Sequence, residues 1–233
     1  MDALPGYVSI VFILTMLATI FFLLRAVRAA GLHRLPAKIL YFLIPLWTIF
    51  TGFIALSGFY QNNASMPPRI AAFGVFPCLV LIVSFFVFFR NGFIDRMPLK
   101  ILTMVHIVRI PVEIVLLWLF IGGQVPRIMT FEGYNFDILS GILAPIVYLV
   151  AFRGGQVNRR VLIVYNVLGM LLLANIVSIA ILSLPSPLQQ LAFDQPNVAV
   201  TYFPFIWLPT IVVPIVLFSH LASLWKLAAG RDN

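Results

Sequence analysis

The chain has 233 residues, of which 62% are hydrophobic and 9% are charged, and its mean hydropathy is +1.08. A soluble domain is typically about half apolar and about a quarter charged, so these values exclude an ordinary water-soluble fold and indicate a membrane-embedded protein. The net charge of +8 is then an orientation signal in a lipid bilayer rather than a nucleic-acid-binding surface. The single cysteine, Cys78, excludes an intramolecular disulfide framework and a cysteine-rich metal site.

The first residues, MDALPGYVSIV, contain no Lys or Arg, so we expect no cleaved signal peptide. Seven segments are apolar enough to cross the hydrocarbon core, for which a helix needs about 20 residues. In chain order they are residues 7–24, 39–59, 70–89, 101–121, 137–152, 161–183 and 203–225. The pattern predicts an all-α, polytopic membrane protein, with residues 1–233 forming a single domain of seven transmembrane helices.

The fifth segment is short, because its apolar run covers only about 22 Å at about 1.5 Å per residue. We therefore expect either that this helix begins earlier, near Tyr134, or that the preceding loop folds down to meet it. In the seventh segment, Pro209 and Pro214 are expected to kink the helix and to leave the carbonyl groups of Phe205 and Thr210 without their usual partners.

The basic residues predict an orientation. Twelve of the 15 Lys and Arg residues lie on one side of the seven segments. They are Arg25, Arg28, Arg34, Lys38, Arg90, Arg96, Lys100, Arg153, Arg159, Arg160, Lys226 and Arg231. The opposite side has only Arg69 and Arg127. By the positive-inside rule, the N-terminus lies outside and the C-terminus lies in the cytoplasm.

Two longer loops, 122–136 and 184–202, face outward in this topology. The second contains SPLQQ, in which Ser186 can cap a helix, Pro187 suits its first position and Gln189 completes a capping box. With apolar residues in the same stretch, this pattern predicts a short interfacial helix over residues 187–193.

The fourth segment contains the stretch MVHIVRIPVEIVLL, with the ionisable residues His106, Arg109 and Glu113. Their spacing of i, i+3, i+7 places them within about 60° on one face of a helix. A charge at the bilayer centre costs at least about 2.5–3.5 kcal/mol, so this stripe is expected to face the bundle interior. Arg109 and Glu113 are also an i, i+4 pair, and we expect them to neutralise each other.

Further polar residues lie at matching depths in other segments. His106, Asn166 and His220 are each about 9 Å, or six residues, from the basic residue at the cytoplasmic end of their segment. We predict a ligand-binding site or ion pathway formed by His106, Arg109, Glu113, Asn166, Asn175 and His220. At its outer mouth we expect Glu132, Asp137, Asp194 and Asn197.

Each of these residues also has a purely structural interpretation. The intramembrane charges can lock helix packing, and the asparagines can be interhelical hydrogen-bonding groups. His220 can extend its ring toward the interface, and the acidic residues Glu132 and Asp137 can solvate a loop and cap a helix. No metal site is predicted, because the third and fourth ligands of a zinc site are missing.

Three motifs make the chain similar to an uncharacterised family of bacterial seven-span integral membrane proteins: HxxRxPxE at 106–113, TFEGxNFD at 130–137 and FDQPN at 193–197. This resemblance covers nearly the full length and implies the bacterial inner membrane, with no activity attached. The topology also resembles that of microbial rhodopsins. A retinal Schiff base, however, needs a lysine in the middle of the last span, and Lys38, Lys100 and Lys226 all lie at cytoplasmic ends, so we expect no retinal.

We expect the polar site to bind or conduct an ion, a proton or a small, anionic molecule, with Arg109 as its electrostatic anchor. One alternative is a membrane-embedded enzyme or redox protein, in which His106 and His220 hold haem or Glu113 and His106 act as acid and base. Another is a non-catalytic scaffold. The expected partners are the lipid bilayer and a small molecule or ion, with an oligomer also compatible with the sequence.

Overall fold

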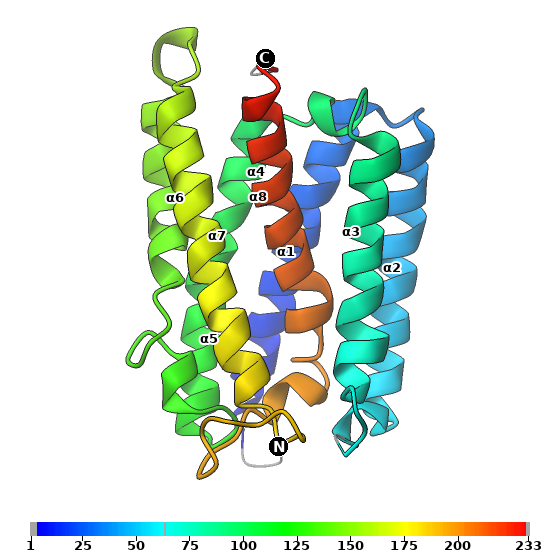
Figure 1. Ribbon diagram of the computed structural model, residues 1–233, viewed down its shortest axis with the longest axis vertical. Coiled ribbons are helices and arrows are strands. Elements are labelled where there is room, and N and C mark those ends of the chain that lie inside the picture. Colours follow the sequence, from blue (N-terminus) through cyan, green and yellow to red (C-terminus); the bar gives the residue numbers. More distant parts are fainter. Residues whose placement is uncertain (1–3, 63, 232–233) are drawn as a thin grey trace.

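A computed structural model describes residues 4–62 and 64–231, which fold into a bundle of roughly parallel and antiparallel helices with no strand among them (Figure 1). The α-helices are α1 (Gly6–Gly31), α2 (Leu35–Leu56), α3 (Phe76–Phe89), α4 (Leu99–Met104), α5 (Arg109–Ile121), α6 (Ile138–Ala151), α7 (Arg159–Leu182) and α8 (Val213–Ala228). Two π-helical stretches, Ala71–Val75 and Leu208–Val212, precede α3 and α8. The all-α prediction is confirmed.

Six helical stretches are long and apolar enough to cross a membrane in the part of the chain that the structure describes. They are Gly6–Gly31, Leu35–Leu56, Ala71–Phe89, Leu99–Ile121, Arg159–Leu182 and Leu208–Ala228, and α6 is a shorter apolar helix. The last stretch begins later than its predicted start at residue 203. Pro204 and Pro209 explain this difference, because proline lacks a backbone donor and disfavours helical geometry in the residue before it.

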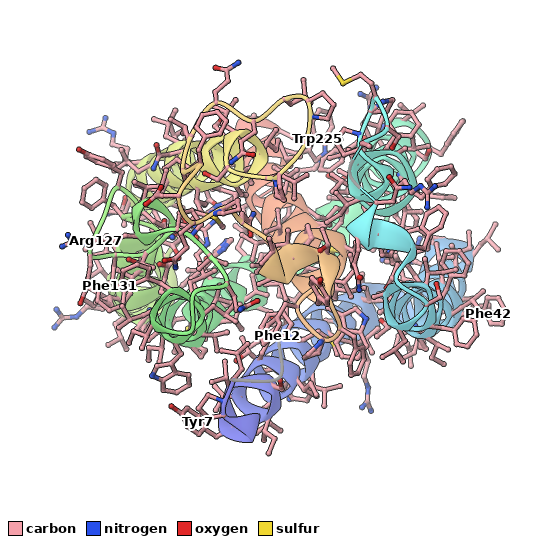
Figure 2. The ribbon with its side chains drawn as sticks, turned by 90° about the horizontal axis from the view of Figure 1, so that it is seen from below. Tyr7, Phe12, Phe42, Arg127, Phe131 and Trp225 are labelled. Carbon is pink, nitrogen blue, oxygen red and sulfur yellow. The ribbon has the colours of Figure 1, made fainter. Side chains whose placement is uncertain are left out.

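The surface of the bundle is apolar, as expected for a protein in lipid. Phe42 projects outward from α2 and is 73% exposed, whereas Phe12 of α1 points inward and is 1% exposed (Figure 2). The inner helices are α8 and the α4–α5 pair: buried residues make up 67% of the apolar stretch in Leu208–Ala228 and 50% in Leu99–Ile121, but 22% in Ala71–Phe89. The polar residues of the fourth and seventh predicted segments therefore meet in the interior.

A 3-10 turn, Val105–Val108, joins α4 to α5 within the fourth predicted segment. Side chains three residues apart eclipse each other in a 3-10 helix, because each residue turns the chain by one third of a circle. His106 and Arg109 consequently project to the same side, toward α6, α7 and α8.

The fifth segment is short because the loop before it enters the bundle. Helix α6 begins at Ile138, and residues 130–137 run inward so that Asn135 and Asp137 are both buried, at 0% and 5% exposure. This outcome is the second of the two alternatives expected from the sequence. Backbone without regular structure is tolerated at membrane depth only where protein buries it and satisfies its polar groups. The hydrogen bonds of Asn135 and Asp137 described below contribute to this.

The seventh segment is irregular where its prolines lie. Pro214 cannot donate to Thr210, and the carbonyl oxygen of Thr210 instead accepts hydrogen bonds from Nε1 of Trp47 at 3.2 Å and Sγ of Cys78 at 3.2 Å. The expected release of the Thr210 carbonyl is confirmed. The carbonyl oxygen of Phe205 is different, because it accepts a bond from the amide of Leu208 at 3.0 Å.

The predicted interfacial helix at 187–193 is wrong. Residues 187–188 form a turn, and no helix is assigned between Ser183 and Val198. The amides of Gln190 and Leu191 both donate to the carbonyl oxygen of Leu182 at the end of α7, at 2.8 and 2.9 Å. These bonds fold the segment back onto α7, so its amides cannot continue a helix from Ser186.

Candidate functional site

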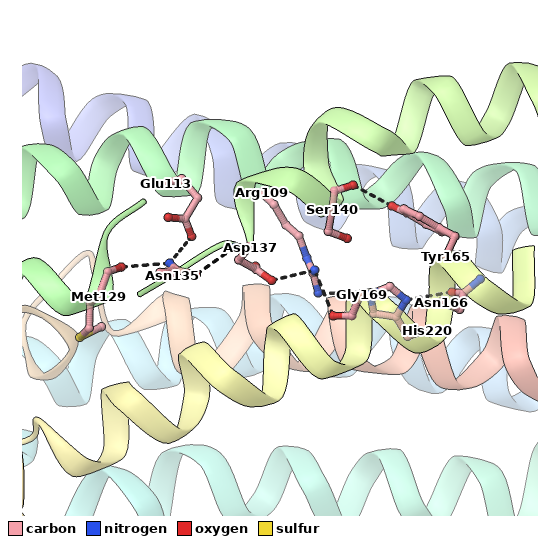
Figure 3. A network of polar contacts seen from close by, with 10 residues as sticks. All are labelled: Arg109, Glu113, Met129, Asn135, Asp137, Ser140, Tyr165, Asn166, Gly169 and His220. Atoms are coloured by element: carbon pink, nitrogen blue, oxygen red, sulfur yellow. Dashed lines mark hydrogen bonds and ion pairs between the residues drawn. The ribbon is translucent and has the colours of Figure 1, made fainter. Parts of the chain in front are cut away.

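The centre of the site is an ion pair between Arg109 of α5 and Asp137, which directly precedes α6 (Figure 3). Nη1 of Arg109 lies 2.8 Å from Oδ1 of Asp137, and the two residues are only 2% and 5% exposed. The same nitrogen donates to the carbonyl oxygen of Gly169 at 3.3 Å. The predicted ion pair between Arg109 and Glu113 is wrong, because the inward-folded loop brings a different carboxylate to the guanidinium.

Glu113 is held instead by Asn135. Oε1 of Glu113 accepts a hydrogen bond from Nδ2 of Asn135 at 2.6 Å, and Asn135 also donates to the carbonyl oxygen of Met129 at 2.9 Å (Figure 3). Glu113 is 1% exposed, and its Oε2 has no hydrogen-bond partner. We did not predict Asn135, although it lies in the TFEGYNFD segment between the two acidic residues that we named.

His220 of α8 bridges Arg109 and Asn166 (Figure 3). Nε2 of His220 lies 3.2 Å from Nη2 of Arg109, and Nδ1 lies 2.8 Å from Oδ1 of Asn166. A guanidinium can only donate, so Nε2 accepts and Nδ1 carries the hydrogen. Asn166 fits this assignment because its amide nitrogen donates to the carbonyl oxygen of Leu162 at 2.8 Å. The network therefore holds His220 as a neutral imidazole.

His106 stacks on His220, with ring centroids 3.8 Å apart and an angle of 15° between the rings. Its exposure is 0%, and neither ring nitrogen has a hydrogen-bond partner. Tyr165 packs against His106 edge-on at 5.8 Å and donates its hydroxyl to the carbonyl oxygen of Ser140 at 2.9 Å. The matching depths predicted for His106, Asn166 and His220 thus correspond to one cluster.

Buried hydroxyl groups without partners continue this cluster along the facing helices. They belong to Thr103, Ser140 and Ser223, which are 1–2% exposed. Thr103 and His106 are three residues apart on the fourth segment, as are His220 and Ser223 on α8. One turn beyond Ser223, Nζ of the buried Lys226 donates to the carbonyl oxygen of Met97 at 2.7 Å. Polar groups therefore extend from Arg109 toward one end of the bundle.

Gly169 of α7 allows the helices to approach closely at this point. A methyl group at Gly169 would lie 2.5 Å from Cε1 of His220 and 3.0 Å from Oγ of Ser140. Only a residue without a side chain fits between them. We did not predict Gly169, Ser140 or Tyr165, because small and aromatic residues carry no distinctive signal in an apolar helix.

Four predicted site residues lie outside the cluster. Asn175 is exposed on α7 and donates to the carbonyl oxygen of Tyr134 at 2.8 Å, so it fastens the loop. Glu132 and Asp194 are exposed. Asn197 is buried and donates to the carbonyl oxygen of Ala180 at 3.2 Å, which ties its loop to α7. The predicted outer mouth is thus not one site, since only Asp137 of its four members enters the network.

The geometry does not fit bis-histidine haem. Axial ligands lie on opposite sides of a porphyrin plane, whereas His106 and His220 stack face to face at 3.8 Å, and both nitrogens of His220 are already engaged. No group of three or more His, Cys, Asp or Glu residues in the described chain could hold a metal ion. An acid–base pair of His106 and Glu113 is also disfavoured, because Glu113 lies on the other side of Arg109 from the histidine stack.

The arrangement is suited to holding and exchanging a proton. The site contains three ionisable groups of opposite sign, the Arg109 guanidinium and the carboxyl groups of Asp137 and Glu113. Its remaining members are neutral imidazole, amide and hydroxyl groups. Arg109 balances only one of the two carboxylates. Burying a second charge without a partner is costly, so the site is balanced when one carboxyl group carries a proton.

The family described as "Domain of unknown function (DUF8737)" matches residues 66–228, a range that contains every member of this polar network. None of the curated proteins and none of the solved structures matches the chain. The matched range extends over well more than half of the sequence. The chain therefore belongs to the DUF8737 family.

Proposed function

We propose that this protein is a polytopic membrane protein that binds a proton at Glu113 and exchanges it through the buried polar network, in proton transport or in pH sensing. The observation that carries the proposal is the charge balance of Arg109, Asp137 and Glu113. The Arg109–Asp137 ion pair is complete, with 2.8 Å between the charged atoms. Glu113 then requires a neutral form, and its free Oε2 can hold the proton.

This balance changes the expected ligand. A single buried arginine favours an anion, but Asp137 occupies one side of the Arg109 guanidinium, and His220 and the carbonyl oxygen of Gly169 occupy other donors. Asp137 already neutralises the guanidinium, of whose three nitrogens only Nε has no hydrogen-bond partner. A proton, or a small cation that replaces it, fits the excess of carboxyl groups better.

Buried polar groups between Arg109 and one end of the bundle supply a route for the proton. Buried polar groups ordinarily hydrogen-bond to protein or to water, and the free atoms of Thr103, His106, Ser140 and Ser223 are buried on the fourth segment, α6 and α8. Both ring nitrogens of His106 lack a hydrogen-bond partner, so they are free to take part in hydrogen-bonded proton transfer. In this proposal Glu113 holds the proton on one side of the Arg109–Asp137 ion pair, and His106 is the group available to carry a proton on the other side.

We further propose the topology that gives this route its direction. The chain would cross the membrane seven times, with α6 as the short fifth span, and its N-terminus would lie outside the cell and its C-terminus in the cytoplasm. The distribution of Lys and Arg supports this orientation, and α1 begins and α8 ends at opposite ends of the bundle (Figure 1). Glu113 then faces the outer loop, and the His106–His220 stack faces the cytoplasm. Together with the similarity of the motifs to bacterial seven-span proteins, this supports a location in the bacterial inner membrane.

Proton flux into proteoliposomes that contain a pH-sensitive dye tests the proposal. The wild-type protein is expected to dissipate an imposed pH gradient, and Glu113→Gln to slow the flux at least about 10-fold because an amide cannot take up a proton. Glu132→Gln is the matched control, since Glu132 is an exposed glutamate in the outer loop, and it should leave the flux unchanged. Equal flux in Glu113→Gln and the wild type would refute transport through Glu113.

A further inference from the structure

A groove with a volume of about 360 Å³ runs along the outer face of the bundle between α6 and α7. Apolar side chains form nearly all of its wall, among them Leu143 of α6 with Val164 and Leu168 of α7. These three residues are 41%, 57% and 53% exposed, so the groove is open along the lipid-facing surface. Arg160 lies at one end of the groove and Ser140 at the other, with Tyr165 between them.

One end of the groove carries positive charge. Arg160, in the first turn of α7, is exposed and lines this end. Its neighbour Arg159 donates to the carbonyl oxygen of Leu227 and is thus held against α8. Residues 138–182, which include both helices and their connection, contain no Asp or Glu. Nothing in these two helices neutralises Arg160, and its charge complements an anion at the membrane surface.

The other end of the groove reaches the wall of the polar site. Gly169 and Ser140 line it there, and Ser140 is 2% exposed with a hydroxyl group that has no partner. From Arg160 to Leu172, the groove follows α7 for about 18 Å at the helical rise. One leaflet of the hydrocarbon core is about 15 Å thick, so the groove has the length of one acyl chain.

We propose that this groove is a binding site for an anionic phospholipid, with one acyl chain between α6 and α7 and the phosphate group on Arg160. The apolar wall contributes through the burial of the chain, and Arg160 contributes through a charge-assisted hydrogen bond to phosphate oxygens. This site does not depend on the proton-binding function of Glu113, because no residue of the groove is needed to hold that proton. The bound chain would cover Gly169, whose carbonyl oxygen accepts a hydrogen bond from Arg109 on the other side of α7.

Native mass spectrometry of the purified protein tests this proposal, with phosphatidylglycerol and phosphatidylcholine of identical acyl chains as the two probes. The wild type is expected to retain one phosphatidylglycerol molecule and at least about 10-fold less phosphatidylcholine. Arg160→Gln should lower phosphatidylglycerol retention to the level of phosphatidylcholine. Arg153→Gln, which removes an exposed charge outside the groove, should not.

A second pair of variants tests the position of the acyl chain. Val164→Trp fills the groove and should reduce the retention of both lipids, whereas Val167→Trp, on an exposed position of α7 that does not line the groove, should reduce neither. Each variant is first checked for monodisperse elution and an unchanged melting midpoint. Equal retention of the two lipids, equal loss in Arg160→Gln and Arg153→Gln, or equal retention in Val164→Trp and Val167→Trp would each overturn the proposal.

Discussion

His106 and His220 stack in parallel with their ring centroids 3.8 Å apart, although they come from the fourth and the last predicted segments. They differ sharply in their hydrogen bonds, since both nitrogens of His220 are engaged and neither nitrogen of His106 has a partner. The two rings therefore have different roles: His220 holds Arg109 and Asn166 in place, and His106 has nitrogens available for a proton.

Replacing each histidine by phenylalanine separates these roles. His220→Phe leaves Nη2 of Arg109 and Oδ1 of Asn166 without partners, and each buried group left unpaired costs about 1–3 kcal/mol of unfolding free energy. His106→Phe removes no hydrogen bond and should leave stability nearly unchanged while slowing proton flux. Denaturant unfolding in detergent together with liposome flux measures both effects. Equal destabilisation by the two variants would contradict this division.

The ion pair at the centre of the network should dominate the stability of the site. Asp137→Asn leaves the buried Arg109 guanidinium without its counter-charge, and breaking a buried pair from one side typically costs about 3–5 kcal/mol. Thermal unfolding should show a large fall in the melting midpoint. Asp194→Asn is the control, because Asp194 is exposed, and it should behave like the wild type. A midpoint in Asp137→Asn equal to that of the control would show that Arg109 is not held as described.

Gly169 should not tolerate even the smallest side chain. In Gly169→Ala the new methyl group would lie 2.5 Å from Cε1 of His220 and 3.0 Å from Oγ of Ser140. Overpacking of this kind costs about 1–3 kcal/mol, and the displaced His220 ring should also disturb proton flux. Gly6→Ala serves as the control, since nothing lies within 4 Å of a methyl group there. Unfolding of both alanine variants at the same denaturant concentration would contradict the close packing of Gly169 against His220 and Ser140.

Much of the fold could be predicted because lipid imposes a simple composition rule. A helix that crosses the membrane needs a long apolar run. The predicted segments agree with the observed helices within four residues except at 25–31, where α1 extends past its predicted end, and at 203–207. The stripe of His106, Arg109 and Glu113 was also predictable, since buried charges select the helix face that points inward. The equal depth of His106, Asn166 and His220 was also readable from the sequence, but only the structure shows that their helices face one another.

The pairings within the site could not be predicted in the same way. Periodicity places Arg109 beside Glu113 on one helix, but the actual partner, Asp137, comes from a loop whose inward course depends on tertiary contacts. Asn135 was missed for the same reason, because its role as donor to Glu113 exists only after that loop enters the bundle. The interfacial helix failed because the carbonyl oxygen of Leu182 captures the amides of Gln190 and Leu191.

The central claim is that Glu113 holds an exchangeable proton inside the bundle. Infrared spectroscopy at pH 7 tests it directly, because exposed carboxyl groups are ionised at this pH and only a protonated buried carboxyl group gives a carboxylic C=O band. The account predicts such a band in the wild type, a shift of the band in D₂O, its loss in Glu113→Gln and its retention in Glu132→Gln. A wild-type spectrum without the band, or a band that persists in Glu113→Gln, would contradict the claim.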